Sequence, residues 1–304
     1  IASCLVGSEM CIRDRGLNAL FGLEYKRYEN QHAEIYATEN SDRAFEEEVM
    51  LSGFANAQVK GEGSGVSFDE AQETFTARYT HETVALAFAI TEEAIEDNLY
   101  DRLASRYTKA LARSMSNAKQ VKAVEPLIQG LPTTNGFDSG DGVSLFNTSH
   151  PTVSGTFQNT LTTQADLNET SLEQSLIDIG QMTDERGLRV AARGVKMIIP
   201  SELQFTAERL MKSQGRTGTA DNDINAIVSM GMVPQGYRVN NYLTDTDAFY
   251  IITDVPNGMK MFNRAPLTTA MEGDFDTGNV RYKARERYSF GVSDPRGIFG
   301  VEGV

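Results

Sequence analysis

The segment 91–124 most constrains what this chain can fold into, because it contains neither glycine nor proline. Thr91 is a favourable helix N-cap. Acidic residues follow in the first turns and basic residues later, which complements the helix dipole at both ends. At about 1.5 Å per residue such a helix reaches roughly 50 Å, which is long for a compact domain. The sequence therefore predicts one long helix that begins after Thr91 and is ended by Pro126 and Pro132.

The apolar residues of this helix recur every four positions, at Ile95, Leu99, Leu103, Tyr107, Leu111 and Met115. Each step of four moves the position by about 40° around a helix of 3.6 residues per turn, so the apolar stripe winds around the axis. A coiled coil needs the alternating three- and four-residue spacing of a heptad, which is missing here. We therefore expect the helix to contact different partners along its length.

The chain is strongly acidic, with 28 Lys and Arg against 42 Asp and Glu and a formal net charge of −14. Since Lys and Arg carry the affinity for nucleic acid, we expect nearby DNA to be contained rather than gripped. The acidity is regional, because residues 16–90 hold 13 acidic and 5 basic residues, a net charge of −8. No apolar run approaches the roughly 18 to 20 residues of a membrane span, so we expect no membrane partner.

Both cysteines, Cys4 and Cys11, lie in the first fifteen residues, so neither a disulfide framework nor a four-cysteine zinc site is available to the main body. Residues 1–15 also differ in character from the rest of the chain and lack the features of a signal peptide. We expect this stretch to be non-native or a disordered tail, and we attach no function to either cysteine.

Residues 16–50 are polar and acidic without a sustained period, which predicts an arm with at most short helical pieces. In residues 51–90 glycines punctuate the first part, and the alternation from Thr74 to Thr83 is typical of a half-exposed strand. This region predicts a long hairpin. A two-stranded hairpin is marginal alone in water, so it needs another surface. That surface is the chain's own core in a monomeric enzyme and a neighbouring copy in an assembling subunit.

Residues 133–258 predict an α+β domain. A loop rich in glycine, serine and threonine comes first, and a capping box from Thr170 to Glu173 then opens an amphipathic helix that Gly187 closes. Val195–Ile199 predicts a strand, and further helical and strand patterns come after it.

Residues 259–304 predict returning strands. Val280–Phe290 alternates tyrosine, alanine and glutamate with arginine and lysine, so we expect a strand with one cationic face. This face could meet the acidic arm or loop of a neighbouring subunit and so guide its registration. A solvated strand face, or ion pairs within one subunit, explains the pattern equally well.

This order of elements resembles tailed-bacteriophage major capsid proteins of the Hong Kong 97-type fold, especially Mu-like major head subunits. The resemblance is most specific in Phe88–Tyr107 (FAITEEAIEDNLYDRLASRY) and Arg285–Gly300 (RERYSFGVSDPRGIFG). Neither stretch is a catalytic signature, so the resemblance rests on architecture and sequence character. It covers nearly all of the chain after Gly16.

The resemblance implies an α+β fold with four parts. Residues 16–50 would be the N-arm, 51–90 the E-loop, 91–132 together with 259–304 the peripheral domain with its spine helix, and 133–258 the axial domain. The implied function is that of a non-enzymatic virion subunit of a Caudoviricetes phage. Its copies would assemble as hexamers and pentamers in the host bacterial cytoplasm.

The implied partners are other copies of the chain, scaffold, portal and decoration proteins, and packaged double-stranded DNA without sequence-specific contacts. We expect the subunit interface to include Lys60, Phe68, Phe75, Tyr79, Arg285, Arg287 and Arg296. We do not expect covalent cross-linking through Lys60, because a single lysine in a loop is usually only solvated.

The sequence predicts no catalytic residue, cofactor or metal. The chain has three histidines, His32, His81 and His150. They are far apart in sequence, which favours ordinary structural roles over a metal site. The glycines of residues 61–65 lack the spacing of a dinucleotide fingerprint.

Three acidic clusters also lack the pattern of a known site. The clusters at 138–142 and 221–223 fit turns better than a calcium loop, because neither has the bidentate Glu at the twelfth position. Asp184 and Glu185 beside Arg186 indicate a solvated helix end rather than an acid–base pair.

Two other functions stay open. An encapsulin-like nanocompartment subunit would share the fold but enclose enzymes, and a cargo-enzyme gene next to this one would favour it. A monomeric hydrolase with clustered carboxylates is the contrasting class. It predicts a compact monomer with a deep acidic pocket, whereas a shell subunit predicts a protruding hairpin and arm.

Overall fold

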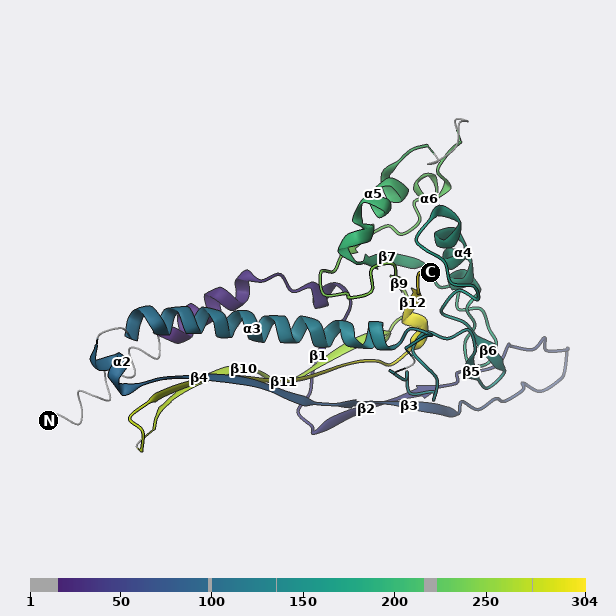
Figure 1. The fold of residues 1–304 in the computed structure, drawn as a ribbon. Coiled ribbons are helices and arrows are strands. Elements are labelled where there is room, and N and C mark those ends of the chain that lie inside the picture. Colours follow the sequence, from purple (N-terminus) through teal and green to yellow (C-terminus); the bar gives the residue numbers. More distant parts are fainter. Residues whose placement is uncertain (1–15, 98–99, 135, 216–222, 275) are drawn as a thin grey trace.

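The long helix lies along a four-stranded sheet, and a second sheet with three helices forms a lobe at one end of this layer (Figure 1). The structure is a computed structural model that describes residues 16–97, 100–134, 136–215, 223–274 and 276–304. The expectations for residues 1–15, for Leu99 and for Asp221 and Asn222 lie outside these residues. None of the described helices is both long and apolar enough to cross a membrane.

The predicted long helix is present as α2 (Glu92–Glu96) and α3 (Tyr100–Gln129). The Ala94 N–H donates to the Thr91 hydroxyl at 3.4 Å, so Thr91 acts at the helix start as predicted.

Pro126 lies inside α3, so the prediction that it ends the helix is wrong. A proline in a helix interior costs about 3 kcal/mol, because one backbone hydrogen bond is lost and the ring crowds the preceding turn. Val124 and Leu127, on either side, are 1% and 0% exposed, and the Gly130 N–H donates to the Pro126 carbonyl at 3.0 Å. Burial of the flanking side chains offsets the cost, and the helix continues for three more residues.

The buried face of α3 contacts different groups along its length, which confirms the winding apolar stripe. Leu111 and Met115 pack with Tyr282 of the sheet. Farther along the helix, Leu127 packs in a different cluster, which includes Ile298 near the C-terminus. Tyr107 is 44% exposed, and its ring lies 5.6 Å from that of Phe88 on β4, the edge strand of the sheet.

The four-stranded sheet has the order β1-β10-β11-β4. Its strands are β1 (Ala37–Asn40), β4 (Glu82–Ile90), β10 (Met259–Gly273) and β11 (Val280–Val292). Strand β1 is parallel to β10, and the other neighbours are antiparallel. The face of this sheet that is covered by α3 is mostly apolar. On the opposite face, Phe262 packs against Tyr79 of β3 at one end, and Arg281, Lys283 and Arg285 are exposed farther along β11.

The hairpin lies at a different place in the sequence than predicted. Strand β2 (Phe45–Leu51) pairs with β3 (Glu73–Thr80), and residues 52–72 form the long loop between them. The predicted return strand included residues 82–90, but these form β4 of the four-stranded sheet. Ile90 is 3% exposed beneath α3. In a hairpin surrounded by solvent it would stay exposed, so pairing within the sheet is favoured because it buries this side chain.

Residues 16–27 form a helix that packs on the chain's own sheet. The sequence predicted an arm with at most short helical pieces, and this part of it belongs to the core of the subunit. Leu17 and Phe21 are buried against α3 and Tyr282. The Asn18 side chain accepts hydrogen bonds from Thr269 at 2.6 Å and from Tyr282 at 2.7 Å. A short 3-10 helix, η1 (Gln31–Glu34), then leads into β1.

The lobe is built on a second four-stranded sheet of order β12-β9-β7-β8. Its strands are β7 (Gly194–Ile199), β8 (Tyr237–Val239), β9 (Phe249–Thr253) and β12 (Ile298–Val301). The lobe helices are α4 (Glu169–Gln181), η2 (Ser201–Leu203), α5 (Gln204–Lys212) and α6 (Ala226–Ser229). A small hairpin, β5 (His150–Thr152) with β6 (Gly155–Phe157), lies at the edge of the lobe.

The cap of α4 differs from the prediction. Asn168 is the N-cap, and Ser171 completes the capping box, in place of Thr170 and Glu173. The Asn168 side chain accepts from the Ser171 N–H at 2.8 Å. Asparagine is among the strongest N-cap residues, so the helix begins earlier than expected.

The C-terminal residues do not all return to the layer of α3, as was predicted for 259–304. After the 3-10 helix η3 (Pro295–Gly297), β12 pairs with β9 inside the lobe. Phe299 and Val301 are fully buried there. Ile298 of the same strand packs in the cluster that holds Leu127 of α3, so β12 contributes to the cores of both the lobe and the layer.

Candidate assembly surfaces

The loop 52–72 between β2 and β3 holds apolar side chains out in solvent. Val59 is 100% exposed, Phe68 97%, Val66 69% and Phe54 61%. The loop projects past the small β5–β6 hairpin, away from the rest of the molecule (Figure 1). Lys60 is exposed on the same loop. Each buried phenylalanine or valine would contribute about 1.5–3 kcal/mol, so this segment is suited to lie against a second surface.

The base of the loop is held by defined polar contacts. The Asp69 carboxylate accepts from the Ala55 N–H at 2.7 Å and from the Glu70 N–H at 3.0 Å. The Ala55 bond is the main reason why the pKa of Asp69 lies below its usual value. Arg186, which lies after α4 in the lobe, donates to the Glu70 carbonyl at 2.7 Å. The ordered base fixes the direction in which the exposed loop leaves the molecule.

Acidic side chains of the hairpin stem point inward, toward a buried lysine. Lys260, 6% exposed, reaches Glu48 at 2.5 Å and Glu39 at 3.2 Å. Burial by itself lowers the pKa of Lys260, but the hydrogen bonds to these two carboxylates more than compensate and raise it. The Lys260 ammonium is therefore charged, and it ties β2 to β1 and β10.

The opposite face of the stem holds exposed apolar side chains. Phe45, Val49 and Leu51 are 39%, 46% and 59% exposed. The Arg78 guanidinium lies 4.1 Å from the centre of the Phe45 ring. Glu47, which pairs with Arg78 at 3.8 Å, lies on the same side, so this face of the stem mixes exposed apolar and charged side chains.

The open face of the four-stranded sheet carries the predicted row of cations. Arg281, Lys283 and Arg285 are exposed and Arg287 is half-buried, while Tyr282, Ala284, Glu286 and Tyr288 of the same strand are buried. The strand with one cationic face is therefore confirmed.

Small side chains border this row of cations. Ala85 is opposite Arg285, and Ala87 is opposite Lys283, on β4. On the other side, Thr268 of β10 is opposite Arg285. Because residues directly opposite in a sheet share a face, a partner segment could approach the guanidinium groups without steric hindrance.

Two of the predicted interface residues are not on a surface. Tyr79 is 3% exposed, and its hydroxyl shares a hydrogen bond of 2.5 Å with that of Ser293. Arg296 is 3% exposed and forms ion pairs with Glu185 at 2.6 Å and Asp294 at 3.2 Å. Both predictions of surface exposure are wrong, because each polar group finds partners inside the same chain.

The remaining predicted interface residues keep some exposure. Lys60, Phe68 and Arg285 are exposed, and Phe75 and Arg287 are half-buried. Sequence reasoning missed the exposed face of the stem and the residues Phe54, Val59 and Val66. The available signal was the presence of apolar residues among the glycines of residues 53–65, where no helical or strand period explains them.

A polar cluster under helix 16–27 is buried. Glu286 is 2% exposed and pairs with Lys119 at 3.2 Å, and the Tyr25 hydroxyl lies 3.5 Å from the same carboxylate. Burial is the main reason why the pKa of Glu286 is raised. This cluster connects the N-terminal helix, α3 and β11, so its role is structural.

All three histidines are buried and hydrogen-bonded within the chain. His150 donates from Nδ1 to Asp141 at 2.7 Å. The Asp141 carboxylate also accepts from Ser139 at 2.6 Å, as the turn interpretation of residues 138–142 predicts. His81 lies within 3.0 Å of Ser41 and 2.9 Å of Ser289. Among the described residues, no group of three His, Cys, Asp or Glu is placed to hold a metal ion.

Glu185 does not lie at a solvated helix end, as was predicted. It is 3% exposed and paired with Arg296. The neighbouring Asp184 accepts from the backbone N–H groups of Arg186 at 2.9 Å and Leu188 at 2.8 Å, which builds a turn.

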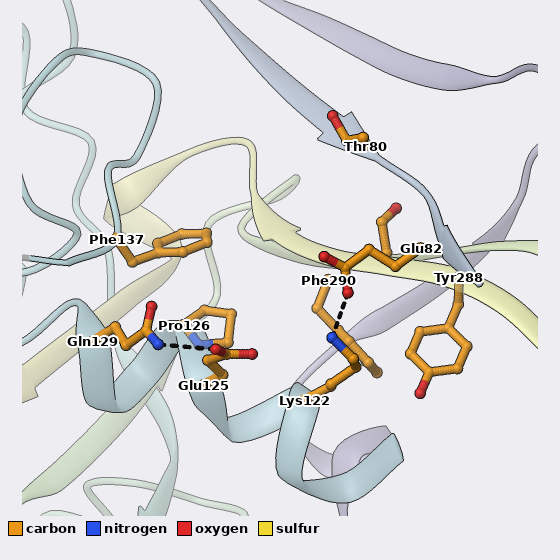
Figure 2. Close-up of a pocket in the computed structure, with 10 residues that line it drawn as sticks. Thr80, Glu82, Lys122, Glu125, Pro126, Gln129, Phe137, Tyr288 and Phe290 are labelled. Atoms are coloured by element: carbon orange, nitrogen blue, oxygen red, sulfur yellow. Dashed lines mark hydrogen bonds and ion pairs between the residues drawn. The ribbon is translucent and has the colours of Figure 1, made fainter. Parts of the chain in front are cut away.

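A pocket of about 240 Å³ lies between the C-terminal turns of α3 and the junction of β3 with β4 (Figure 2). Its charged groups are already paired, because Lys122 contacts Glu82 and Gln129 donates to Glu125 at 2.9 Å. Phe137 covers one side of it. The pocket offers mixed polarity and paired side chains, unlike the deep acidic cleft that the hydrolase alternative predicts.

Comparison with known proteins was made on sequence and on structure. A protein family described as "Phage capsid protein" matches residues 73–301 of this chain. No curated protein is significantly similar in sequence.

Three solved structures illustrate the likeness in fold. A virus-like particle from Pyrococcus furiosus has 10% identity and a TM-score of 0.55, covering 95% of this chain and 98% of that one. The capsid of an empty GTA particle has 12% identity and a TM-score of 0.56, with 90% and 89% covered. The capsid of Myoviridae phage XM1 has 11% identity and a TM-score of 0.53, with 88% and 90% covered. The mixed α+β fold of this chain is therefore that of such capsid and particle subunits.

Proposed function

The chain belongs to the phage capsid protein family, and on that premise we propose how its copies join into a shell. As a member it is a major capsid protein, a structural and non-catalytic component of the virion that forms an icosahedral shell. The prediction that it is not an enzyme is confirmed by this membership. Its copies assemble with one another, and hexamers and pentamers are the capsomers that we propose.

Each part of the fold has a proposed role in the shell. The hairpin and loop, 45–80, act as the E-loop, and α3 acts as the spine helix of the peripheral domain. The lobe acts as the axial domain, and β12 belongs to it. Of the predicted N-arm, 16–50, the segment between helix 16–27 and β2 contains η1 and β1, and β1 is paired with β10.

The exposed loop carries this proposal. Phe68 is 97% exposed and Val59 is 100% exposed on a segment that projects away from its own chain. Ordering a loop costs roughly 1–2 kcal/mol per residue in backbone entropy, so contacts outside the chain must stabilise its working conformation. A neighbouring copy supplies those contacts in a shell, where each subunit presents the same loop to the next.

The cationic face of β11 is the acceptor that we propose for that loop. The loop 52–72 holds Glu62, Asp69 and Glu70 against Lys60, which is three acidic and one basic residue and a net charge of −2. Opposite charge on two surfaces favours the correct register and penalises like-charged pairings. The interface then joins two different patches, which is the heterologous type that closes into rings.

Further partners belong to the same role. Scaffold, portal and decoration proteins, and packaged double-stranded DNA, are the other partners of a phage shell that we propose.

The runner-up function is an encapsulin-like compartment. The fold match to the Pyrococcus furiosus particle favours it, but a match at 10% identity supports fold alone. Purified particles that hold an enzyme instead of nucleic acid would decide for the compartment.

The experiment compares two single variants. Phe68→Ser removes the most exposed aromatic side chain and should leave a folded chain that fails to form uniform particles in electron microscopy. Phe205→Ser, the same change at a position of α5 that is 71% exposed, is the matched control and should assemble like the wild type. Normal particles from Phe68→Ser would contradict the proposed role of the loop.

A second experiment addresses the acceptor face. Arg285→Glu with Arg287→Glu should reduce particle formation, and adding Glu70→Arg should restore part of it if the two surfaces meet. Unchanged assembly after the charge reversal would remove the acceptor from the proposal.

A further inference from the structure

One stretch of α3 departs from the acidic character of the chain. From Arg102 to Val124 there are six basic residues and no acidic residue, although the whole chain has a formal charge of −14. Two of the six are used inside the subunit, because Lys119 pairs with Glu286 at 3.2 Å and Lys122 pairs with Glu82. Arg106, Lys109 and Arg113 have a different environment.

Arg106, Lys109 and Arg113 lie on one exposed stripe of α3. Their spacing of three and four residues places them on the same side of the helix, within about 11 Å along the axis. In the described part of the chain none of the three forms an ion pair. Like charges at this spacing destabilise a helix slightly, and an external anion against the stripe would relieve this repulsion.

This stripe faces away from the cationic face of β11. The opposite side of α3 buries Leu111 and Met115 against Tyr282, so the helix separates the stripe from the sheet. The hairpin and its acidic loop lie on the sheet's side of this layer (Figure 1). A neighbour's loop that covers β11 therefore leaves the stripe of α3 uncovered, and its anion must come from another source.

The chemistry of the stripe fits a phosphate backbone better than a protein surface. Small or polar residues, Ala110, Ser114 and Asn117, lie between and beyond the cations and are exposed. They offer little apolar area, whereas protein interfaces have an apolar core. Polar, cationic surfaces are typical of contacts with nucleic acid.

A shallow groove of about 550 Å³ runs beside the stripe, between α3 and helix 16–27. Lys109 and Arg113 line one side, and Tyr28 and Glu24 line the other. The Glu24 carboxylate is engaged locally, since it accepts from the Tyr28 hydroxyl at 3.2 Å and pairs with Arg27 at 3.6 Å. The open charge along this groove is therefore positive.

We propose that Arg106, Lys109 and Arg113 of α3 contact the phosphate backbone of the double-stranded DNA enclosed by the shell. This inference rests on the proposed function, because a shell subunit places one side of its layer toward the contents. It also refines the expectation that DNA is contained rather than gripped. Each copy offers only three cations, so each contact is weak and reversible, and many copies line the DNA without reading its sequence.

The expected salt dependence comes from the number of cations. Neutralising three phosphates gives a slope of about −2.7 in log affinity against log salt. The affinity of the full chain for DNA should then fall roughly 40-fold between 50 and 200 mM salt. Fluorescence anisotropy with a labelled duplex of about 20 base pairs measures this.

The test uses two triple variants with equal loss of charge. Arg106→Gln/Lys109→Gln/Arg113→Gln should lower DNA affinity at least about 10-fold at 50 mM salt and bring the slope close to zero. The control replaces three exposed cations of the lobe, Arg193→Gln/Arg209→Gln/Lys212→Gln, and should stay within about 2-fold of the wild type. Both variants should retain the helical circular dichroism of the wild type.

The outcomes separate this inference from the proposed function. Equal loss of DNA binding in both variants, unchanged binding in the α3 variant, or no binding by the wild type would overturn the inference. Binding of polyglutamate as tightly as DNA would assign the stripe to an acidic protein and would also overturn it. Electron microscopy of the wild-type particles tests the proposed function separately, since a shell can form whether or not α3 contacts DNA.

Discussion

Replacing Arg296 with methionine should destabilise the folded chain itself, and not merely its assembly. The Arg296 guanidinium is 3% exposed and pairs with Glu185 at 2.6 Å. Its Nε donates to the Thr183 carbonyl at 2.8 Å, and the group lies 4.2 Å from the centre of the Phe157 ring. Methionine keeps most of the side-chain volume but removes every polar contact.

The size of the effect depends on the group that loses its partner. Glu185 is itself 3% exposed, so the variant leaves a buried carboxylate unpaired. Breaking a buried pair in this way costs about 3–5 kcal/mol. At about 2–4 °C per kcal/mol for a protein of somewhat smaller size, the melting temperature should fall by at least roughly 6 °C.

Urea unfolding followed by far-ultraviolet circular dichroism is the appropriate assay, because the chain has no tryptophan. Arg285→Met, at an exposed position of β11, is the control and should change the free energy of unfolding by less than about 0.5 kcal/mol. The double variant Glu185→Leu/Arg296→Met should recover part of the lost stability, because it removes the unpaired carboxylate. An Arg296→Met chain as stable as the wild type that fails to assemble would refute this reasoning and return Arg296 to the interface.

Three further predictions concern His32, the glycine contact between lobe and layer, and Gly180 of α4. Burial and then the charge of a nearby lysine lower the pKa of His32 to about 4, so the stability that its neutral form contributes is complete above pH 6.5 and lost as the pH falls through 4. His32→Gln should therefore remove about 3 kcal/mol of the difference in unfolding free energy between pH 7 and pH 4, and an unchanged pH dependence would contradict this. Gly297→Ala should destabilise the chain by more than about 1 kcal/mol in the same assay, because its Cβ would overlap the Gly258 backbone. Gly180→Ala, where nothing lies within 4 Å, should instead stabilise α4 by about 0.5–1 kcal/mol, and a loss of stability there would count against the helix geometry.

Local patterns in the sequence were enough to predict the regular elements. The glycine-free segment after Thr91 became α2 and α3, and Val280–Phe290 became the centre of β11 with its cationic face. Val195–Ile199 became most of β7. In each case a period of 3.6 or 2 extends over enough residues to outweigh the alternatives.

Local patterns were not enough where distant residues compete for the same segment. Leu17, Phe21 and Tyr25 have helical spacing, but the pattern extends over only a few turns, and only the sheet beneath them shows why they form a helix. Pro126 stays within α3 because its neighbours are buried on both sides. Asn168 and Thr170 lie two residues apart and could each be the N-cap of α4, and packing selects between them.

The candidate surfaces divide in the same way. That Phe68 and Arg285 would lie at a surface was predictable from a glycine-rich loop and an alternating strand. Tyr79 and Arg296 have similar local patterns, but they are buried because Ser293 and Glu185, far away in sequence, supply their polar partners.

The sequence by itself determined which segments are helical or extended and where opposite charges gather, because these depend on neighbours a few residues apart. Only the tertiary structure decided which strands share a sheet, which charges are paired inside, and that residues 52–72 and the stripe of α3 stay free on opposite sides of the layer. The physical reason is that burial and pairing depend on contacts between residues far apart in the chain. The free energies of these contacts exceed most local conformational preferences.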